Sequence, residues 1–368
     1  MTLRTTDISE DGRISYESMP RAKLDESKFV NHFLKPGDLV ITRSGRVGTT
    51  AVFDGFPEPV LPGAFLIRFR LREGADPRFF CYWFNSRIGQ QRLLSVARGA
   101  AQQNINITNV KALKVPLPSI TTQRAIASIL SAYDDLIENN RRRIQLLEEA
   151  ARLLYREWFV HLRFPGHEHV AIKDGVPEGW EKKTLGEIAA TNVESYKAST
   201  LPDIINYIDI SSVEQGRITK KNTMPSSEAP GRARRKARPG DIIWSNVRPN
   251  LRAFALILDP EENDVFSTGF TVISPITVPF TYLYLFVTTD EFVGHLVNHT
   301  TGASYPAVRS EDFERAIVLV PPKQVLELFN EKAEPIYKFI SVLEEEMKLL
   351  AQARDLLLPR LMNGGVAV

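Results

Sequence analysis

The second half of the chain repeats the first at an almost constant offset of 203 residues. The tripeptide PGD at positions 36–38 returns at 239–241, and the leucine pair at 146–147 returns at 349–350. One offset held over more than about 120 residues indicates a duplicated structural unit rather than chance likeness. The chain is therefore predicted to be a tandem duplication of a globular domain followed by a helix.

Each repeat ends in a long heptad pattern. The first pattern runs from Gln123 to Phe159, which is 37 residues, and the second runs from Gln324 to Leu361. Apolar residues at alternating steps of three and four are typical of a helix that packs along another helix, and the first would form a rod of about 55 Å. Two such seams most simply pack on each other as an antiparallel pair, with one domain at each end. Two helices buried in separate bundles are the alternative.

The helix pair has a predicted core with two irregular positions. Asn140 fills the one polar core position of the first helix, where it would fix the register at some cost in stability. Pro335 should kink the second helix or mark its start, because a proline removes a helical hydrogen bond. The predicted core positions are Ile126, Leu130, Tyr133, Ile137, Asn140, Ile144, Leu147 and Leu154 in the first helix, and Ile336, Ile340, Leu343, Met347, Leu350 and Leu357 in the second.

The segments outside the helices have the composition of mixed α/β domains. Strands are expected over 37–44, 64–71 and 113–118, and a helix after Pro77. The predicted fold class is α+β: a tandem repeat of two α/β domains separated by two long helices that form an antiparallel coiled coil. The predicted boundaries are 1–121 for the first domain, 122–164 for the first helix, 165–322 for a linker and the second domain, and 323–368 for the second helix and tail.

One stretch of the second domain has no counterpart in the first. Residues 180–204 would align upstream of Met1, so the first domain lacks about 25 residues of its twin. We therefore expect a first domain that is truncated at its N-terminus.

Composition points to a soluble, cytoplasmic protein. The chain of 368 residues has a single cysteine, which excludes an internal disulfide and a thiolate metal cluster. It contains no run of about 18 apolar residues and no signal-peptide pattern, so no membrane contact is expected. The net charge of +2 is uninformative, and a nucleic-acid role has to rest on local basic clusters.

Motifs for catalysis are largely missing from the sequence. It has no Gly-rich phosphate loop and no nucleophile elbow. His167 and His169 lie in a Pro/Gly linker, where a solvated position is favoured over a metal site. Asp174 with Glu181-Lys182-Lys183 superficially resembles a metal-dependent nuclease pattern, which arises easily by chance in a charged loop. No catalytic or metal site is predicted.

Binding to DNA is the better-supported reading. Turns rich in Arg and Asn follow the PGD strand in each repeat, and these side chains can make paired hydrogen bonds to guanine and adenine edges. A run of cations at 232–238 is either a phosphate-contact loop or a solvated surface loop. The candidate DNA-binding residues are Arg43, Ser44, Arg46, Arg98, Gln102, Gln103 and Asn104 in the first repeat, and Arg232, Arg234, Arg235, Lys236, Asn246, Arg248, Asn250, Arg252, Ser304 and Tyr305 in the second.

The order and duplication of three stretches resembles the specificity subunit of type I restriction–modification enzymes over nearly the whole chain. The stretches are LKPGDLVITRSGRVGTTAVF, ARPGDIIWSNVRPNLRAFAL and the segment from QQNINITNV to LLYREWF. The resemblance implies two target-recognition domains, each reading one half of a bipartite site in double-stranded DNA. It also implies that the helix pair sets the half-site spacing and docks two methyltransferase subunits.

The resemblance further implies that this chain catalyses nothing. Restriction subunits that hydrolyse ATP and cut DNA would join the assembly, and S-adenosylmethionine, ATP and Mg would be bound by partner subunits, with no cofactor in this chain. Two rival functions remain from the residues themselves. One is a stand-alone nuclease that uses Asp174 and Glu181, and the other is a coiled-coil adaptor with two peptide-binding domains.

Overall fold

The computed structural model describes residues 1–97, 104–302 and 305–365, and the chain forms two compact units. Unit 1 comprises residues 1–139 and 346–368, and unit 2 comprises residues 140–345. The division differs from the four consecutive segments expected from the sequence, because each long helix contributes one part to each unit. Within the described residues, no helix combines the length and apolarity needed to cross a membrane.

Unit 1 is built on a three-stranded antiparallel sheet of order β3-β2-β5. A separate parallel pair, β1 with β4, lies beside its own small core. A second core, around Phe79 and Leu130, joins the sheet to helices α1 and α4. The elements are β1 (Thr2–Leu3), β2 (Asp38–Thr42), β3 (Thr50–Phe53), β4 (Leu61–Pro62), β5 (Leu66–Phe69), α1 (Pro77–Asn85), α2 (Arg87–Ser95) and α3 (Ile107–Lys111).

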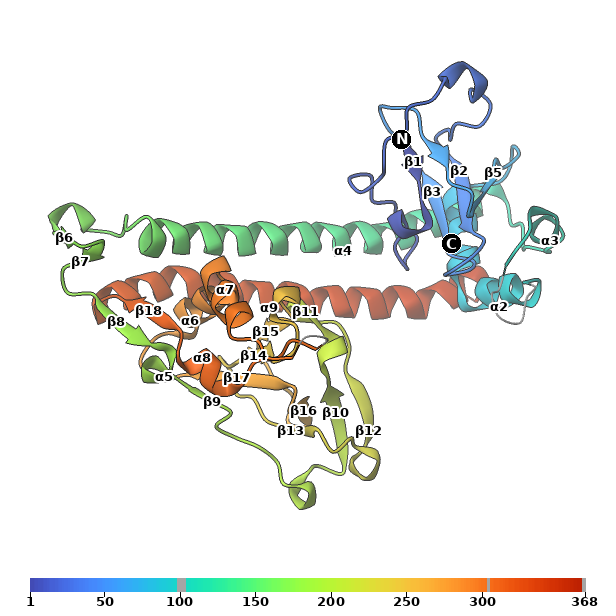
Figure 1. Cartoon of the computed structure of the whole chain (residues 1–368). Coiled ribbons are helices and arrows are strands. Elements are labelled where there is room, and N and C mark those ends of the chain that lie inside the picture. Colours follow the sequence, from blue (N-terminus) through green and yellow to red (C-terminus); the bar gives the residue numbers. More distant parts are fainter. Residues whose placement is uncertain (98–103, 303–304, 366–368) are drawn as a thin grey trace. The chain divides into compact units, whose positions relative to one another are not determined.

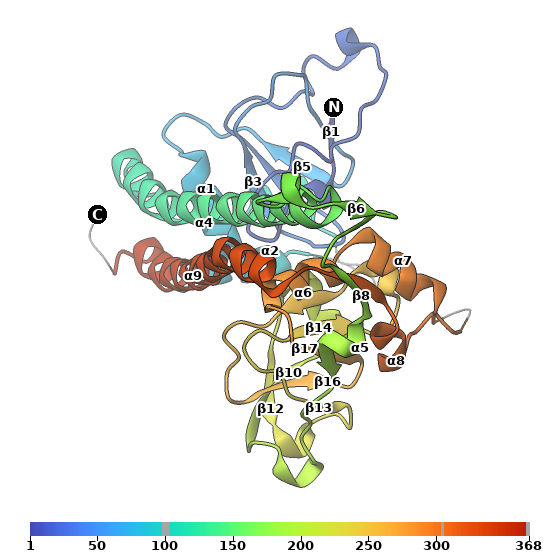
Figure 2. The same ribbon diagram turned by 90° about the vertical axis from the view of Figure 1, so that its left-hand side faces the viewer.

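Unit 2 contains a five-stranded sheet of order β11-β15-β14-β17-β9 and a four-stranded sheet of order β12-β10-β16-β13. Figures 1 and 2 both show the four-stranded sheet farther from the α9 segment of this unit than the five-stranded sheet. Its elements are β6 (Ile172–Lys173), β7 (Val176–Pro177), β8 (Glu181–Thr184), α5 (Leu185–Ile188), β9 (Ala189–Thr191), β10 (Ile204–Ile208), β11 (Val213–Ile218), β12 (Asn222–Pro225), β13 (Ala233–Arg235), β14 (Ile242–Ser245), β15 (Phe254–Leu256), β16 (Asp264–Ser267), β17 (Phe270–Pro275), α6 (Phe280–Val287), α7 (Asp290–Asn298), α8 (Ser310–Glu314) and β18 (Ile317–Val320).

The two units share a set of corresponding strands and helices. The sheet β3-β2-β5 corresponds to β15-β14-β17, the parallel pair β1/β4 to β10/β16, and helices α1, α2 and α3 to α6, α7 and α8. Local hydrogen bonds repeat as well. The Asp38 carboxylate accepts from the Lys35 amide at 2.9 Å, and Asp241 accepts from the Arg238 amide at 2.8 Å. The duplication seen in the sequence is therefore a duplication of fold.

Two long helices, α4 (Ile120–Tyr155) and α9 (Lys323–Met362), contribute to the core of each unit (Figure 1). In unit 2 the end of α4 packs on the start of α9, with Tyr155 and Phe159 against Phe329. In unit 1 the start of α4 shares a core with the end of α9, through Ile126 and Leu361. The helices are thus antiparallel within each unit, and a π-helical turn, Arg156–Val160, follows α4.

The residues predicted for the helix seam are buried or half-buried in the structure. Leu130 and Leu343 are almost fully buried, and Asn140 is 3% exposed with its side-chain oxygen accepting from Arg143. Tyr133, Met347 and Leu350 are half-buried. Pro335 does not mark the start of the second helix, since α9 begins at Lys323 and is continuous through the proline.

Two other local expectations are corrected by the structure. The helix expected after Pro77 is divided into α1 and α2, because the Ser86 hydroxyl caps α2 by accepting from the Gly89 amide at 3.1 Å. The strand expected over 113–118 is absent from the described part of unit 1. Its counterpart β18 pairs with β8, an element for which unit 1 has no equivalent among the described residues.

Candidate nucleic-acid interface

The turns that follow β2 and β14 occupy the same place in the two units. In unit 1 the Ile105 amide donates to the Arg43 carbonyl at 3.1 Å, and in unit 2 the Val308 amide donates to the Asn246 carbonyl at 2.9 Å. The donors of the two bonds are 203 positions apart in the chain, and so are the acceptors. Each unit therefore joins a turn to a segment about 60 residues later, and the candidate residues of both segments come together.

In unit 1 this site combines exposed and buried groups. Arg43 is half-buried and its Nε donates to the Asn104 side chain at 3.3 Å. Arg46 is exposed and lies 3.3 Å from the Glu10 carboxylate. Ser44, predicted in an exposed turn, is only 9% exposed and lies two residues after the end of β2. Arg98, Gln102 and Gln103 lie outside the described residues.

In unit 2 the backbone of the turn after β14 has a larger effect on the placement of the candidate side chains. Asn246 is held by the Thr271 hydroxyl, which donates to its Oδ1 at 2.7 Å, and Asn250 is exposed. The Arg248 guanidinium lies over the Tyr305 ring, 4.8 Å from its centre, an arrangement that favours planar stacking. Arg252 pairs with Asp290, and Ser304 lies outside the described residues.

Arg248 adopts a backbone conformation that glycine holds in the other unit. Its φ is 50°, and its counterpart Gly45 has a φ of 74°. Arg252, at the other end of the same turn, has a φ of 55°. A left-handed conformation costs a non-glycine residue on the order of 1 kcal/mol, and such strain clusters at functional sites. One turn of unit 2 thus carries two arginines in a strained backbone conformation.

Only the middle of the basic run lies on a strand. Residues 233–235 form β13 at the edge of the four-stranded sheet. Arg232 is exposed, while burial lowers the pKa of Arg235, whose guanidinium donates to Ser195 at 3.2 Å. Arg234 donates to the carbonyl of Ala233 at 2.6 Å. The run therefore offers fewer solvent-facing cations than its sequence suggests.

The fold also brings an acid to this run, although the run itself contains none. The Glu194 carboxylate lies 3.5 Å from Lys236 and pairs with Arg238, and Arg238 lowers the pKa of Glu194. Lys236 also lies 5.7 Å from the ring of Tyr196. Glu194 and Thr271 were missed by sequence reasoning, because both reach the candidates across strands and leave no local signal.

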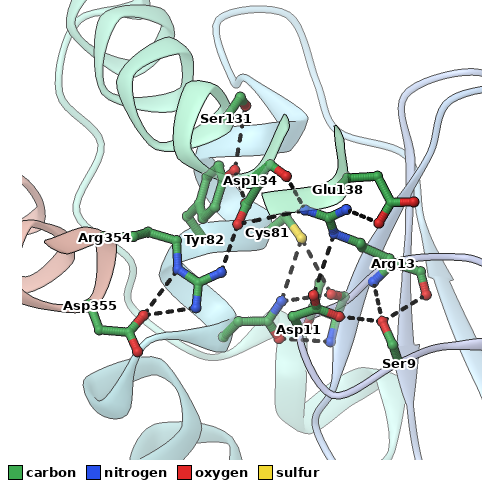
Figure 3. Close-up of polar contacts among 12 residues, drawn as sticks. Ser9, Asp11, Arg13, Cys81, Tyr82, Ser131, Asp134, Glu138, Arg354 and Asp355 are labelled. Carbon is green, nitrogen blue, oxygen red and sulfur yellow. Dashed lines mark hydrogen bonds and ion pairs between the residues drawn. The ribbon is translucent and has the colours of Figure 1, made fainter. Parts of the chain in front are cut away.

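A polar network fastens the N-terminal part of unit 1 to its helices (Figure 3). Arg13 donates to Glu138 at 2.7 Å, and Arg354 donates to Asp134 at 2.6 Å with both side chains 19% exposed. Tyr82 also donates to Asp134, and burial together with that carboxylate raises the pKa of Tyr82. The network borders a cavity of about 990 Å³ whose charged walls pair largely with one another. The contacts of this network hold the N-terminal part of unit 1 against α4 and join α4 to α9.

Cys81, beside this network, is an unreactive thiol. Burial, reinforced by nearby carboxylates, raises the pKa of Cys81 to about 12. A thiol rather than a thiolate therefore predominates at neutral pH, and only the thiolate is strongly nucleophilic.

The residues of the rival nuclease pattern are separated into different elements. Asp174 lies in the turn between β6 and β7, with a φ of 51°, and Glu181 lies on β8 with its carboxylate 2.7 Å from the Lys183 ammonium. The His167 Nδ1 lies 2.8 Å from the carbonyl oxygen of Phe164 and 3.3 Å from the Glu168 carboxylate. Within the described residues, no group of three or more His, Cys, Asp or Glu side chains is placed to hold a metal ion.

Comparison with known proteins identifies the class to which this architecture belongs. Residues 2–149 match the family model of the type I restriction modification DNA specificity domain. The specificity subunit of the MjaIX type I restriction enzyme of Methanocaldococcus jannaschii is 23% identical over 308 residues, which is 81% of this chain and 71% of that protein. The HindI specificity subunit of Haemophilus influenzae is 21% identical over 354 residues, covering 75% of this chain and 74% of that protein.

A solved structure shares the fold. The S subunit of a type I restriction-modification system from M. genitalium superimposes with a TM-score of 0.57 at 18% identity, covering 90% of this chain and 84% of that one. The class is thus that of duplicated α/β domains joined by a long helix pair. Residues 2–149 thus match the type I DNA specificity domain, and the chain is similar over most of its length to specificity subunits of type I restriction enzymes.

Proposed function

We propose that this chain is the non-catalytic DNA-specificity subunit of a type I restriction–modification complex, reading a bipartite target in double-stranded DNA. One observation carries the proposal above the others. The turns after β2 and β14 are held by the same backbone hydrogen bond in both units, yet they present different side chains. Two domains that recognise different half-sites require the same backbone support and different polar side chains.

The polar residues divide into two roles. Arg43 and Asn104 in unit 1, and Arg248 and Asn250 in unit 2, contact base edges, since Arg and Asn can pair with guanine and adenine. Arg46 and Arg232 are exposed cations that contact phosphates and give salt-dependent affinity without sequence preference. Restriction subunits that hydrolyse ATP and cut DNA complete the assembly, and S-adenosylmethionine, ATP and Mg bind to partner subunits.

Two methyltransferase subunits dock on the outer faces of the helices. Leu146 and Leu153 of α4 are 65% and 51% exposed, and their counterparts Leu349 and Leu356 of α9 are 55% and 68% exposed. Each pair is spaced by seven residues on one helix face, outside the packed seam. Two equivalent apolar pairs, one per repeat, favour two copies of one partner over a single unrelated protein.

The test is the DNA methylation pattern of cells with and without this chain. Loss of the chain should abolish methylation at a split motif with a fixed spacer. The Asn250→Ala variant should alter one half of that motif, and Asn104→Ala should alter the other. Methylation that is unchanged without the chain would overturn the proposal. So would magnesium-dependent cleavage of plasmid by the purified chain alone, if Glu181→Ala abolished it.

A further inference from the structure

Phe65 lies opposite Arg43, the first residue of the turn that follows β2. Strands β2 and β5 pair antiparallel, and their last registered pair is Thr42 with Leu66. One position further, the Arg43 amide donates to the Phe65 carbonyl at 2.9 Å. Opposed residues of an antiparallel pair place their side chains on the same face, with Cβ atoms about 5 Å apart. Phe65 therefore shares a face with Arg43, whose Nε donates to Asn104.

The ring of Phe65 is exposed on a firmly held backbone. Phe65 is 61% exposed, whereas the next residue, Leu66, is 8% exposed. The Leu66 amide donates to the Gly63 carbonyl at 3.0 Å, and the Gly63 amide donates to the Leu3 carbonyl at 2.8 Å. A Cβ atom at Gly63 would lie only 2.8 Å from that carbonyl oxygen, so the turn sits close against β1. A ring on such a turn has little conformational freedom to lose when it binds a partner.

The fold itself does not require an aromatic side chain at this position. In unit 2 the Asn246 amide donates to the Gly269 carbonyl at 2.8 Å, directly after the last β14–β17 pair, Ser245 with Phe270. Gly269 therefore takes the place of Phe65 in a turn with the same hydrogen bond. Single exposed apolar side chains are common on protein surfaces, but this one lies beside two side chains that we assign to base contacts.

We propose that Phe65 recognises a thymine in the half-site of unit 1, by contact of its ring with the C5-methyl group in the major groove. This inference rests on the proposed function. Arg and Asn form their paired hydrogen bonds to guanine and adenine in the major groove, and a side chain on the same face reaches the same groove. A phenylalanine has no polar atom to offer there, and the thymine methyl is the apolar group that base edges expose in that groove.

The register also predicts where this thymine lies. Opposed side chains start about 5 Å apart, and successive base pairs are about 3.4 Å apart along the DNA axis. The thymine should therefore lie within about two base pairs of the one that Arg43 contacts. Changing Arg43 to Ala identifies that base pair, because the variant should lose its preference there.

The first experiment removes only the methyl group from the DNA. The complex with its methyltransferase subunits is titrated with duplexes in which each thymine of the unit 1 half-site is replaced in turn by deoxyuridine. Affinity should fall about fourfold at one position, which is the contribution of one buried methyl group. The Phe65→Gly variant should bind the thymine and uracil duplexes equally well. A half-site without a thymine, no position sensitive to the methyl group, or the same sensitivity in the variant would overturn the proposal.

The second experiment compares the DNA methylation patterns of cells that carry single variants. Phe65→Gly, which installs the residue of unit 2, should relax the preference for thymine at that one position, and Phe65→Leu should keep it. Leu117→Ala, at a 65% exposed position of the same unit, is the control and should leave the motif unchanged. If Phe65→Gly weakened binding without altering the preference at any base pair, the ring would not read a base and the proposal would be wrong.

The two proposals fail in different ways. If the parent chain directs methylation to no split motif, the function proposed above is wrong. If the motif is present and Phe65→Gly leaves its thymine preference intact, only the role of Phe65 is wrong.

Discussion

Arg248 is the single residue at which strain and chemistry coincide. Glycine holds the equivalent position in unit 1, so an arginine there is retained at a conformational cost on the order of 1 kcal/mol. Its stack on Tyr305 recovers about 0.5–1 kcal/mol at an exposed site. The side chain is therefore nearly neutral for folding, and contact with DNA is the role that we propose for it.

We predict that Arg248→Gly leaves the free energy of unfolding within about 1 kcal/mol of the parent. It should weaken binding to the cognate site by roughly tenfold or more, since a paired contact to a base contributes about 1–3 kcal/mol. Urea unfolding and DNA binding by the assembled complex measure the two effects. Arg252→Gly is the matched control, because Arg252 has the same backbone conformation but already pairs with Asp290. Equal loss of affinity in both variants would contradict the assignment.

Glu344 gives unit 2 a pH-dependent stability. Burial and the neighbouring Glu148 carboxylate raise the pKa of Glu344 to about 7, against the lowering effect of Arg217. Burial raises the pKa of Glu148 as well, against the effect of Arg152 at 3.7 Å. An acid whose pKa is raised by folding binds more protons in the folded state, so stability falls as pH rises from about 4.5 to about 7 and stays low above that range.

We predict that Glu344→Gln stabilises the chain at pH 8 and changes little at pH 4.5. Although burial raises its pKa, the Glu344 side chain still contacts solvent, so screening limits the gain to about 1 kcal/mol or less. Unfolding midpoints measured across this pH range test the sign. Glu331→Gln, on an exposed face of the same helix, serves as control and should show no such trend. A gain that is larger at pH 4.5 than at pH 8 would refute the mechanism.

At the scale of elements, the sequence predicted the features that produce a periodic pattern, namely the long helices and the repeat. The heptad spacing located both helices to within a few residues, and the constant offset related β2 and α3 to β14 and α8. The spacing of apolar residues does not show whether a strand pairs with another strand. The segment 113–118 has strand composition but forms no strand. Residues 233–235 of the basic run form an edge strand, and Glu194 lies beside Lys236.

The candidate site was predictable in place but not in detail. The turns after the PGD strands were found because they recur in both repeats with Arg and Asn. The positive φ of Arg248, the burial of Ser44 and the support of Asn246 by Thr271 depend on contacts between distant segments. Such contacts follow from the tertiary fold, and a single sequence carries no direct trace of them.

The family resemblance implies that the helices set the half-site spacing, and the length of the helices makes this testable. Inserting one heptad after Asn139 in α4 and one after Glu345 in α9 keeps the apolar seam in phase. Seven residues add about 10 Å, or about three base pairs of B-DNA. Methylome sequencing should show the same two half-sites with a spacer longer by about three base pairs. If an active variant kept the original spacer length, the helices would not set the half-site spacing.

For the molecule as a whole, the duplication makes a prediction about stoichiometry. The exposed pair Leu146 and Leu153 on α4 and the pair Leu349 and Leu356 on α9 are related by the repeat, so each should dock one methyltransferase subunit. A leucine buried at an interface contributes about 1.5–3 kcal/mol, and an aspartate in its place would leave a charge without a partner.

Changing Leu146 and Leu153 to Asp should therefore reduce the complex from two methyltransferase copies to one, and changing all four leucines should leave none. Native mass spectrometry of the complex reads the copy number directly. Ile172→Asp, at a 57% exposed position in β6, is the control and should retain both copies. Loss of both copies when only the α4 pair is changed would show that the partner binds as one preformed unit. In that case the leucine pairs of α4 and α9 would not be two independent docking faces, although the folds of the two units correspond.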